Sequence, residues 1–318
     1  MRLCMMVEGQ EGVSWRDWVA LADACERAGM DGLFRSDHYL SVVGRRERPS
    51  LDALTTLAGL AARTERIRLG ALVSPVTFRH PSVLAKSVAT IDHISGGRVE
   101  LGLGAGWNEA EHAAYGFPFP DLRTRMELLE EQLEIIHRQW AEDSVTLAGR
   151  HYRLEECPAL PKPLQLPHPP IILGGSAGPR SVALAVRFAD EYNTLLASVE
   201  DCRERKARLV EACERAGRDP RTLSLSLMAT CAVGADRAEV VERVRCVLRV
   251  WGADDQDPEQ VLTKRAARWV AGTPAEVVEQ LRAFEGAGVE RVYLQHLAHA
   301  DVGMVALLGE EVVPAMEG

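Results

Sequence analysis

The chain has 318 residues, of which 47% are apolar and 26% are charged, so it is long and apolar enough to bury a sizeable core. Its formal net charge of -9 and its sequence pI of about 5.6 argue against a nucleic-acid partner and against a basic membrane-binding face. The seven cysteines are scattered singly without metal-ligand spacing, and no apolar stretch is long enough to span a membrane. The sequence therefore predicts a cytoplasmic protein with reduced thiols, no metal site and no membrane segment.

Strand-like apolar runs alternate with helical periodicity along nearly the whole chain. The predicted strands, in chain order, are residues 3–7, 32–36, 67–74, 98–103, 171–173, 192–195, 222–233 and 291–294. The predicted helices between and after them are residues 15–28, a helix capped by Ser50 that reaches residue 63, and then 82–94, 122–140, 180–188, 201–216, 236–249, 274–287 and 300–315.

This alternation predicts an α/β fold with a parallel sheet and right-handed crossovers. Eight strands favour a closed (β/α)8 TIM barrel over an open doubly wound sheet. No Gly/Ser-rich linker divides the chain, so residues 1–318 are expected to form one domain. Two long segments without a clear pattern, 142–170 and 251–267, are interpreted as insertions in the βα loops.

The C-terminal ends of the strands carry the ligand site in such a barrel, so the residues that follow each strand are the candidates. The second predicted strand runs out on Asp37 and His38. The ordinary pKa of histidine, near 6.5, suits His38 to donate or accept a proton. A histidine that is only hydrogen-bonded at a strand end is an equally good interpretation.

Three further strand ends carry unusual residues. The third strand runs into Leu72, Val73, Ser74 and a proline, which indicates a bulged wall or else a plain loop. The fourth strand ends in LGLGAGWNEAE (101–111), where alternating glycines indicate close backbone approach. This spacing does not fit the dinucleotide fingerprint, so a nicotinamide coenzyme is not expected.

The fifth predicted strand ends in a run of small residues that leads into a helix with proline in its first turn. Free N–H groups and the positive end of the helix dipole would form an anion site there, and the alternative is a flexible loop. Together, the four strand ends describe a pocket for a flat ring with a phosphorylated tail. The small residues and the charge that follows them are Gly174, Gly175, Ser176, Ala177, Gly178 and Arg180.

On these residues the chain resembles the bacterial luciferase-like superfamily (LLM class) of flavin and deazaflavin oxidoreductases, in particular its branch that uses coenzyme F420. The resemblance covers nearly the whole chain. It rests on Ser36-Asp37-His38, ERIRLGALVSPVTFRHPSVLA (65–85), GGRVELGLGAGWNEAEHAAYG (96–116), GRHYRL (149–154), the LGGSAGPRS run and AGTPAEVVEQL (271–281).

The resemblance implies an oxidoreductase that transfers a hydride between the deazaflavin C5 and a small organic substrate, as a reductase or a dehydrogenase. Two alternatives stay open: an FMN-dependent monooxygenase of the same superfamily, and a non-catalytic protein that binds the coenzyme. Relatives are commonly homodimers, so a homodimer is expected here.

The resemblance also implies roles for single residues. A non-proline cis peptide at Leu72–Val73 would form a bulge behind the ring. Asp37 would lie at the polar edge of the ring or hold His38 in place, and His38 would lie beside the reacting face. The implied catalytic residues are Asp37, His38, Trp107 and Asn108. The implied coenzyme contacts are Asp37, His38, Leu72, Val73, Ser74, Gly104, Ala105, Gly106, Gly174, Gly175, Ser176, Ala177, Gly178 and Arg180.

Some residues carry weaker interpretations. Members that oxidise sugar phosphates have a catalytic glutamate where this chain has Trp107, so that activity is not expected. The basic run at 44–48 either meets the acidic tail of the coenzyme or is a solvated loop. Further candidates for the mouth of the barrel or for an anionic substrate are His296, His299, Lys264, Arg265 and Arg268.

Overall fold

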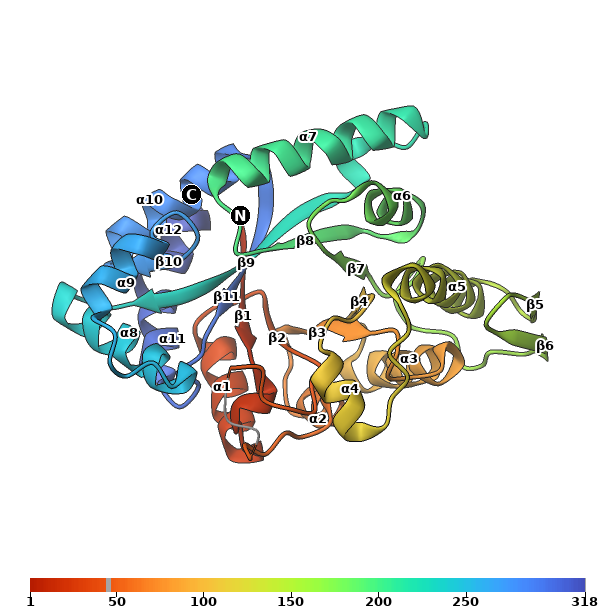
Figure 1. Cartoon of the computed structure of the whole chain (residues 1–318), viewed down its shortest axis with the longest axis horizontal. Coiled ribbons are helices and arrows are strands. Elements are labelled where there is room, and N and C mark those ends of the chain that lie inside the picture. The colour runs from red at the N-terminus through yellow and green to blue at the C-terminus, as the bar shows by residue number, and fades with distance from the viewer. Residues whose placement is uncertain (44–46, 318) are drawn as a thin grey trace.

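A computed structural model describes residues 1–43 and 47–317 (Figure 1). Its main sheet has nine strands, and eight of them close into a parallel barrel in the order β9-β11-β1-β2-β3-β4-β7-β8, with β8 pairing back onto β9. The predicted (β/α)8 TIM barrel is therefore confirmed. The barrel strands are β1 (Arg2–Val7), β2 (Gly32–Arg35), β3 (Arg68–Pro75), β4 (Val99–Gly104), β7 (Ile171–Gly174), β8 (Glu191–Leu195), β9 (Ser224–Val233) and β11 (Val289–Gln295); β10 (Val270–Gly272) pairs with β9 outside the ring.

Helices surround the barrel, as Figure 1 shows. The helix predicted from Ser50 begins later, because Asp52 is its N-cap and accepts a hydrogen bond from the Thr55 N–H. The last predicted helix is divided by a π-helical turn, η3 (Leu308–Val312). The helices are α1 (Trp15–Arg27), α2 (Ala53–Ala61), α3 (Pro81–Ser95), α4 (Glu109–Tyr115), α5 (Leu122–Ala141), α6 (Pro179–Phe188), α7 (Val199–Arg215), α8 (Arg237–Trp251), α9 (Pro258–Arg265), α10 (Pro274–Gly286), α11 (Val302–Leu307) and α12 (Val313–Glu317), with 3-10 turns η1 (Gly9–Glu11) and η2 (Pro220–Thr222).

The two segments predicted as irregular insertions contain regular structure. Residues 142–170 include an antiparallel hairpin of β5 (Val145–Ala148) and β6 (Arg153–Cys157), which lies beyond α5 in Figure 1. The hairpin buries Leu147 and Leu154 against Ile135 of α5. The second segment contains helix α9, which packs in a small cluster with α8.

Side chains alternate between two cores along the barrel strands. In β1, Leu3 and Met5 join the large core between strands and helices, whereas Cys4 and Met6 face the barrel interior. This period of two is the geometry of a barrel wall. The interior cluster also contains Phe34, Leu72, Ile172, Met228 and Tyr293.

A buried ion cluster fills the N-terminal end of the barrel. Arg291 donates to Glu100 over 2.7 Å, and the Tyr293 hydroxyl donates to Glu191 over 2.7 Å. Arg68 forms a second ion pair with Glu100. Buried charges are tolerated when each has such partners. Because this end is filled, a ligand has to approach from the opposite, C-terminal mouth.

Candidate active site

The parallel strands bring the predicted site residues to one rim. His38 follows β2, Val73 lies near the end of β3, Trp107 follows β4, and Gly175 follows β7. All four strands point the same way and lie next to one another in the barrel. The carboxyl ends of parallel strands form one face, so these residues surround a common mouth.

The wall of this mouth at β3 is bulged. The Leu72–Val73 peptide bond is cis, and the pairing of β3 with β4 shifts register between Ala71 and Ser74. The prediction of a non-proline cis peptide at this bond is therefore confirmed. Leu72 is buried in the interior cluster, and Val73 packs against that cluster while remaining partly exposed.

Glycines in β4 and β7 make room for the bulge. A Cβ atom added to Gly104 would lie 2.7 Å from Cγ2 of Val73, and one added to Gly174 would lie 3.3 Å from Cγ1. A Cβ at Gly102 would lie 2.1 Å from the carbonyl oxygen of Ala71. The alternating glycines thus mark close backbone approach, as predicted, and the group they admit is the displaced Val73 side chain.

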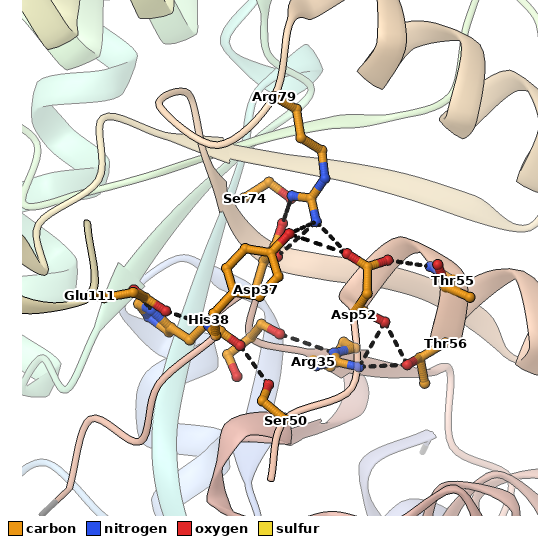
Figure 2. Close-up of polar contacts among 12 residues, drawn as sticks. Arg35, Asp37, His38, Ser50, Asp52, Thr55, Thr56, Ser74, Arg79 and Glu111 are labelled. Atoms are coloured by element: carbon orange, nitrogen blue, oxygen red, sulfur yellow. Dashed lines mark hydrogen bonds and ion pairs between the residues drawn. The ribbon is translucent and has the colours of Figure 1, made fainter. Parts of the chain in front are cut away.

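Asp37 is fully engaged behind this wall (Figure 2). Its carboxylate accepts a hydrogen bond of 2.6 Å from the Ser74 hydroxyl and is ion-paired with Arg79 through both oxygens. Arg79 also donates to Asp52 over 2.9 Å. Burial alone would lower the pKa of Arg79, but the charge of Asp37 raises it well above its ordinary value. Asp37 therefore organises Ser74 and Arg79, and its predicted roles toward the coenzyme ring and His38 stay predictions.

Glu111 of α4 holds His38. Nδ1 of His38 lies 2.7 Å from Oε2 of Glu111, and the Ser50 hydroxyl donates to the His38 carbonyl oxygen over 2.7 Å. The two side chains meet from separate segments in Figure 2. Glu111 is completely buried, whereas the His38 side chain keeps 13% exposure toward the mouth. Nδ1 of the imidazole is thus anchored by Glu111, and Nε2 takes no part in this contact.

The electrostatics of the mouth favour the protonated form of His38. Burial alone would lower the pKa of His38. The hydrogen bond to Glu111 and the negative charges of Glu111, Glu8 and Asp37 outweigh burial and raise the pKa above its ordinary value. This raised pKa suits a group that exchanges a proton near neutral pH.

Trp107 forms an exposed wall beside His38. Its side chain is 65% exposed, and its ring lies edge-on to the imidazole at a centroid distance of 5.6 Å.

Asn108 has a structural role, because its side-chain oxygen caps α4 by accepting from the Glu111 N–H. Gly106 needs to be glycine, since its φ is +78°. A catalytic role for Asn108 and a coenzyme contact from Ala105 stay predictions.

The small-residue run after β7 is less open than predicted. The Gly175 N–H donates to the Asn193 carbonyl oxygen over 3.0 Å, and the Ala177 N–H donates to the Tyr192 hydroxyl over 2.8 Å. Arg180 reaches α5, where it contacts the Arg123 carbonyl oxygen and Glu130. Two of the predicted free N–H groups are therefore occupied, and Arg180 points toward α5. Gly178 caps α6 without a side-chain hydrogen bond, and Ser176 is exposed.

Three residues at the mouth were missed by the sequence reasoning: Glu8, Arg79 and Glu111. Glu8 follows Cys4 and Met6 at the period of two that faces the interior, so the alternation of β1 could have found it. Its carboxylate accepts from the side-chain amides of Gln10 over 2.8 Å and Gln295 over 2.6 Å. Arg79 and Glu111 lie in loops or short helices far along the chain from their partners, so no local pattern indicates them.

The weaker candidates have structural partners. Nε2 of His296 lies 3.0 Å from the Asp301 carbonyl oxygen, and burial lowers the pKa of His296 to about 4. His299 lies 3.9 Å from Asp17 at the start of α1. Arg48 is ion-paired with Glu11, and residues 44–46 of the basic run lie outside the described residues. Lys264 and Arg265 end α9, and their contact with a substrate, like that of Arg268, stays a prediction.

Within residues 1–43 and 47–317, no cluster of three or more His, Cys, Asp or Glu side chains has the arrangement of a metal site. In the same part of the chain, no helix combines the length and the hydropathy needed to cross a membrane.

The closed ring of eight parallel strands defines this chain as a TIM barrel, with a cis peptide bond in a bulge at its mouth. A family model described as luciferase-like monooxygenase matches residues 3–291. The chain therefore belongs to the luciferase-like monooxygenase family.

Individual relatives agree with this assignment. The chain is 29% identical to an F420-dependent glucose-6-phosphate dehydrogenase of Nakamurella multipartita, over 93% of this chain and 91% of the relative. It is 30% identical to an F420-dependent hydroxymycolic acid dehydrogenase of Mycobacterium tuberculosis, over 80% and 72% of the two chains. Its fold is similar to that of an F420-dependent secondary alcohol dehydrogenase solved with an F420–acetone adduct. That comparison has a TM-score of 0.82 and 20% identity, and it covers 99% of this chain and 98% of the other.

Proposed function

We propose that this protein is a coenzyme F420-dependent oxidoreductase that transfers a hydride to or from a small organic substrate at the C-terminal mouth of the barrel. The observation that carries the proposal is the meeting, at one rim, of the Leu72–Val73 bulge and the Glu111-anchored His38. The similarity to relatives named as F420-dependent dehydrogenases over nearly the full chain supports it.

The residues at the mouth fit a flat coenzyme with a phosphate. Glycines on β4 and β7 admit the Val73 side chain, so Val73 forms the wall at this part of the mouth. A Cβ atom at Gly175 would lie 2.6 Å from the Tyr192 hydroxyl, so this part of the rim has to stay bare. The start of α6 at Gly178 offers the positive end of a helix dipole without a capping side chain. Val73 would contact the ring, and Ser176 and Gly178 would contact the phosphate.

The residues of the chain supply the proton chemistry. When bound, F420 would accept or donate the hydride of a two-electron step. In the oxidation of an alcohol by this chemistry, the substrate hydroxyl would have to lose a proton. His38 would take that proton, and in the reverse reduction it would return the proton to the oxygen. Trp107 would form the side of the substrate pocket and shield the exchange from water.

Glucose-6-phosphate is not carried over from the relatives. Trp107 occupies the position at which the sequence resemblance places a catalytic glutamate in sugar-phosphate oxidising members. We therefore propose a small substrate of another kind, and the loops at 41–48, 142–170 and 251–267 are where its selectivity would be set.

Coenzyme binding separates the proposal from the FMN-dependent alternative. Purified protein is titrated separately with F420 and with FMN, and binding is read from the change in coenzyme fluorescence. We expect saturable binding of F420 and markedly weaker binding of FMN. Tight binding of FMN without binding of F420 would overturn the proposal in favour of a flavin monooxygenase.

Two matched variants test the phosphate position. Ser176→Glu places a negative charge at the exposed start of α6, whereas Leu166→Glu places the same charge on a residue that is 91% exposed before β7. We expect weaker F420 binding for Ser176→Glu only.

Turnover is then measured with a panel of secondary alcohols and enones. Binding without turnover of any member of the panel would favour a coenzyme-binding protein over an enzyme.

A further inference from the structure

The pairing of His38 with Glu111 has a chemical consequence for the mouth of the barrel. We propose that Glu111 is a positioning residue that fixes His38 in its Nδ1–H tautomer, so that the proton is exchanged at Nε2. The proposal deepens the function of the same site and rests on the proposed oxidoreductase activity. Its structural part can be tested without coenzyme or substrate.

Glu111 holds His38 and the loop after it together. Oε2 of Glu111 contacts Nδ1 of His38, while Oε1 accepts hydrogen bonds from the Tyr39 N–H and, over 3.1 Å, from the Leu40 N–H. All of these contacts converge on a carboxylate with no solvent exposure. One residue of α4 thus fixes both the imidazole and the backbone of the loop that carries it.

The tautomer follows from the chemistry of the partners. An ionised carboxylate can only accept hydrogen bonds, so Nδ1 of His38 has to carry a hydrogen. In the neutral imidazole this leaves the lone pair on Nε2. The partly exposed ring lies beside Trp107 at the mouth, which makes Nε2 the nitrogen available to a substrate.

The other charges around His38 do not replace Glu111. Glu8, after β1, and Asp37, the preceding residue, both add negative charge. Asp37 is neutralised by its ion pair with Arg79, and Glu8 is hydrogen-bonded to two glutamine amides. Of the acids that face His38, Glu111 is the one whose carboxylate contacts the ring in the described structure.

Glu111→Gln makes a specific prediction because the two oxygens of Glu111 have different partners. Two backbone N–H groups donate to Oε1, so the glutamine has to turn its carbonyl oxygen toward them. Its NH2 group then faces Nδ1 of His38 and donates to it. The tautomer of His38 is thereby inverted to Nε2–H, and Nε2 can no longer accept a proton. Glu109→Gln is the matched control, because Glu109 is exposed in the first turn of the same helix.

The experiment records nitrogen–hydrogen correlations of the imidazole rings as a function of pH. His38 is one of nine histidines, and its signals are assigned by their loss in His38→Asn. We expect Nδ1–H in the wild type and in Glu109→Gln. We expect Nε2–H and a lower His38 pKa in Glu111→Gln. An unchanged tautomer and pKa in Glu111→Gln would overturn the proposal.

The wild-type spectrum is decisive even if Glu111→Gln does not fold, because an Nε2–H tautomer in the wild type would also overturn the proposal. Turnover provides the functional test, with F420 and the secondary alcohols of the panel. We expect Glu111→Gln to lose kcat more than it raises KM, and Glu109→Gln to retain both. If the wild type fails to bind F420, the proposed function is wrong. The tautomer of His38 is still tested separately, because the spectra need no coenzyme.

Discussion

Two histidines, His38 and His296, make the stability of the barrel respond to pH in opposite directions. His38 faces an acid and is more basic in the folded chain, whereas His296 is buried beside a backbone carbonyl group and is less basic. For His38, the folded state binds the proton more tightly, so its contribution to stability is present at low pH and is lost as the pH rises through its folded pKa. For His296, the unfolded chain binds the proton more tightly, so stability is lost as the pH falls.

The behaviour of His296 can be measured. Its pKa falls from 6.5 to about 4 on folding, so the free energy of unfolding should decrease between these values as the pH is lowered. The loss should be about 3 kcal/mol, since each pH unit corresponds to about 1.4 kcal/mol. His296→Gln keeps an N–H donor for the Asp301 carbonyl oxygen and removes the titration. Urea unfolding across this pH range should show a shallower decrease for this variant; equal slopes for both proteins would contradict the assignment.

At the scale of elements, the bulge in β3 and the glycines of β4 and β7 form one unit. Val73 occupies space that exists because Gly104 and Gly174 have no side chains. The consequence is a wall whose backbone departs from regular pairing at the place where we propose that the coenzyme binds. The glycines of β4 and β7 are therefore explained by the conformation of β3 beside them.

Gly104→Ala tests this dependence. The added methyl group would meet Val73 at 2.7 Å, so overpacking should cost about 1–3 kcal/mol in the free energy of unfolding. The cost should be smaller in a Val73→Ala background, because the clashing methyl groups are absent. Gly286→Ala, whose added Cβ has nothing within 4 Å, is the control and should cost nothing. Equal costs of Gly104→Ala in both backgrounds would show that Val73 is not the group that requires the glycine.

At the scale of the whole molecule, the two ends of the barrel differ in kind. The N-terminal end is filled by the cluster of Arg291, Glu100, Glu191 and Tyr293. The C-terminal mouth gathers His38, Trp107 and the bulge at Val73. This polarity is the one expected of a TIM barrel, with stability at one face and chemistry at the other. The expectations of one domain over residues 1–318 and of a homodimer stay predictions.

The barrel was predictable because its eight strands are short apolar runs followed by periodic helices, which is a local signal. The hairpin at Val145 and Leu154 was missed because its strands are brief and bury few side chains against α5. The bulge at Leu72–Val73 followed from resemblance and was found where expected.

The side-chain partners were not predictable from local patterns. His38 and Glu111 are separated by 73 positions, and Asp37 and Arg79 by 42. Such pairs exist only once the strands are side by side. The small-residue run after β7 shows the same limit, since its composition did not indicate that residues of β8 accept from the N–H groups of Gly175 and Ala177.

The central claim is that the bulged mouth of this barrel binds the ring of F420 beside His38. A crystal structure of the protein with F420 tests it most directly. We predict that the ring lies against Leu72–Val73, with the phosphate at Ser176 and Gly178 and with His38 at the face of the ring that is open to substrate. A ring bound away from the bulge, or a phosphate at a different strand end, would contradict the account.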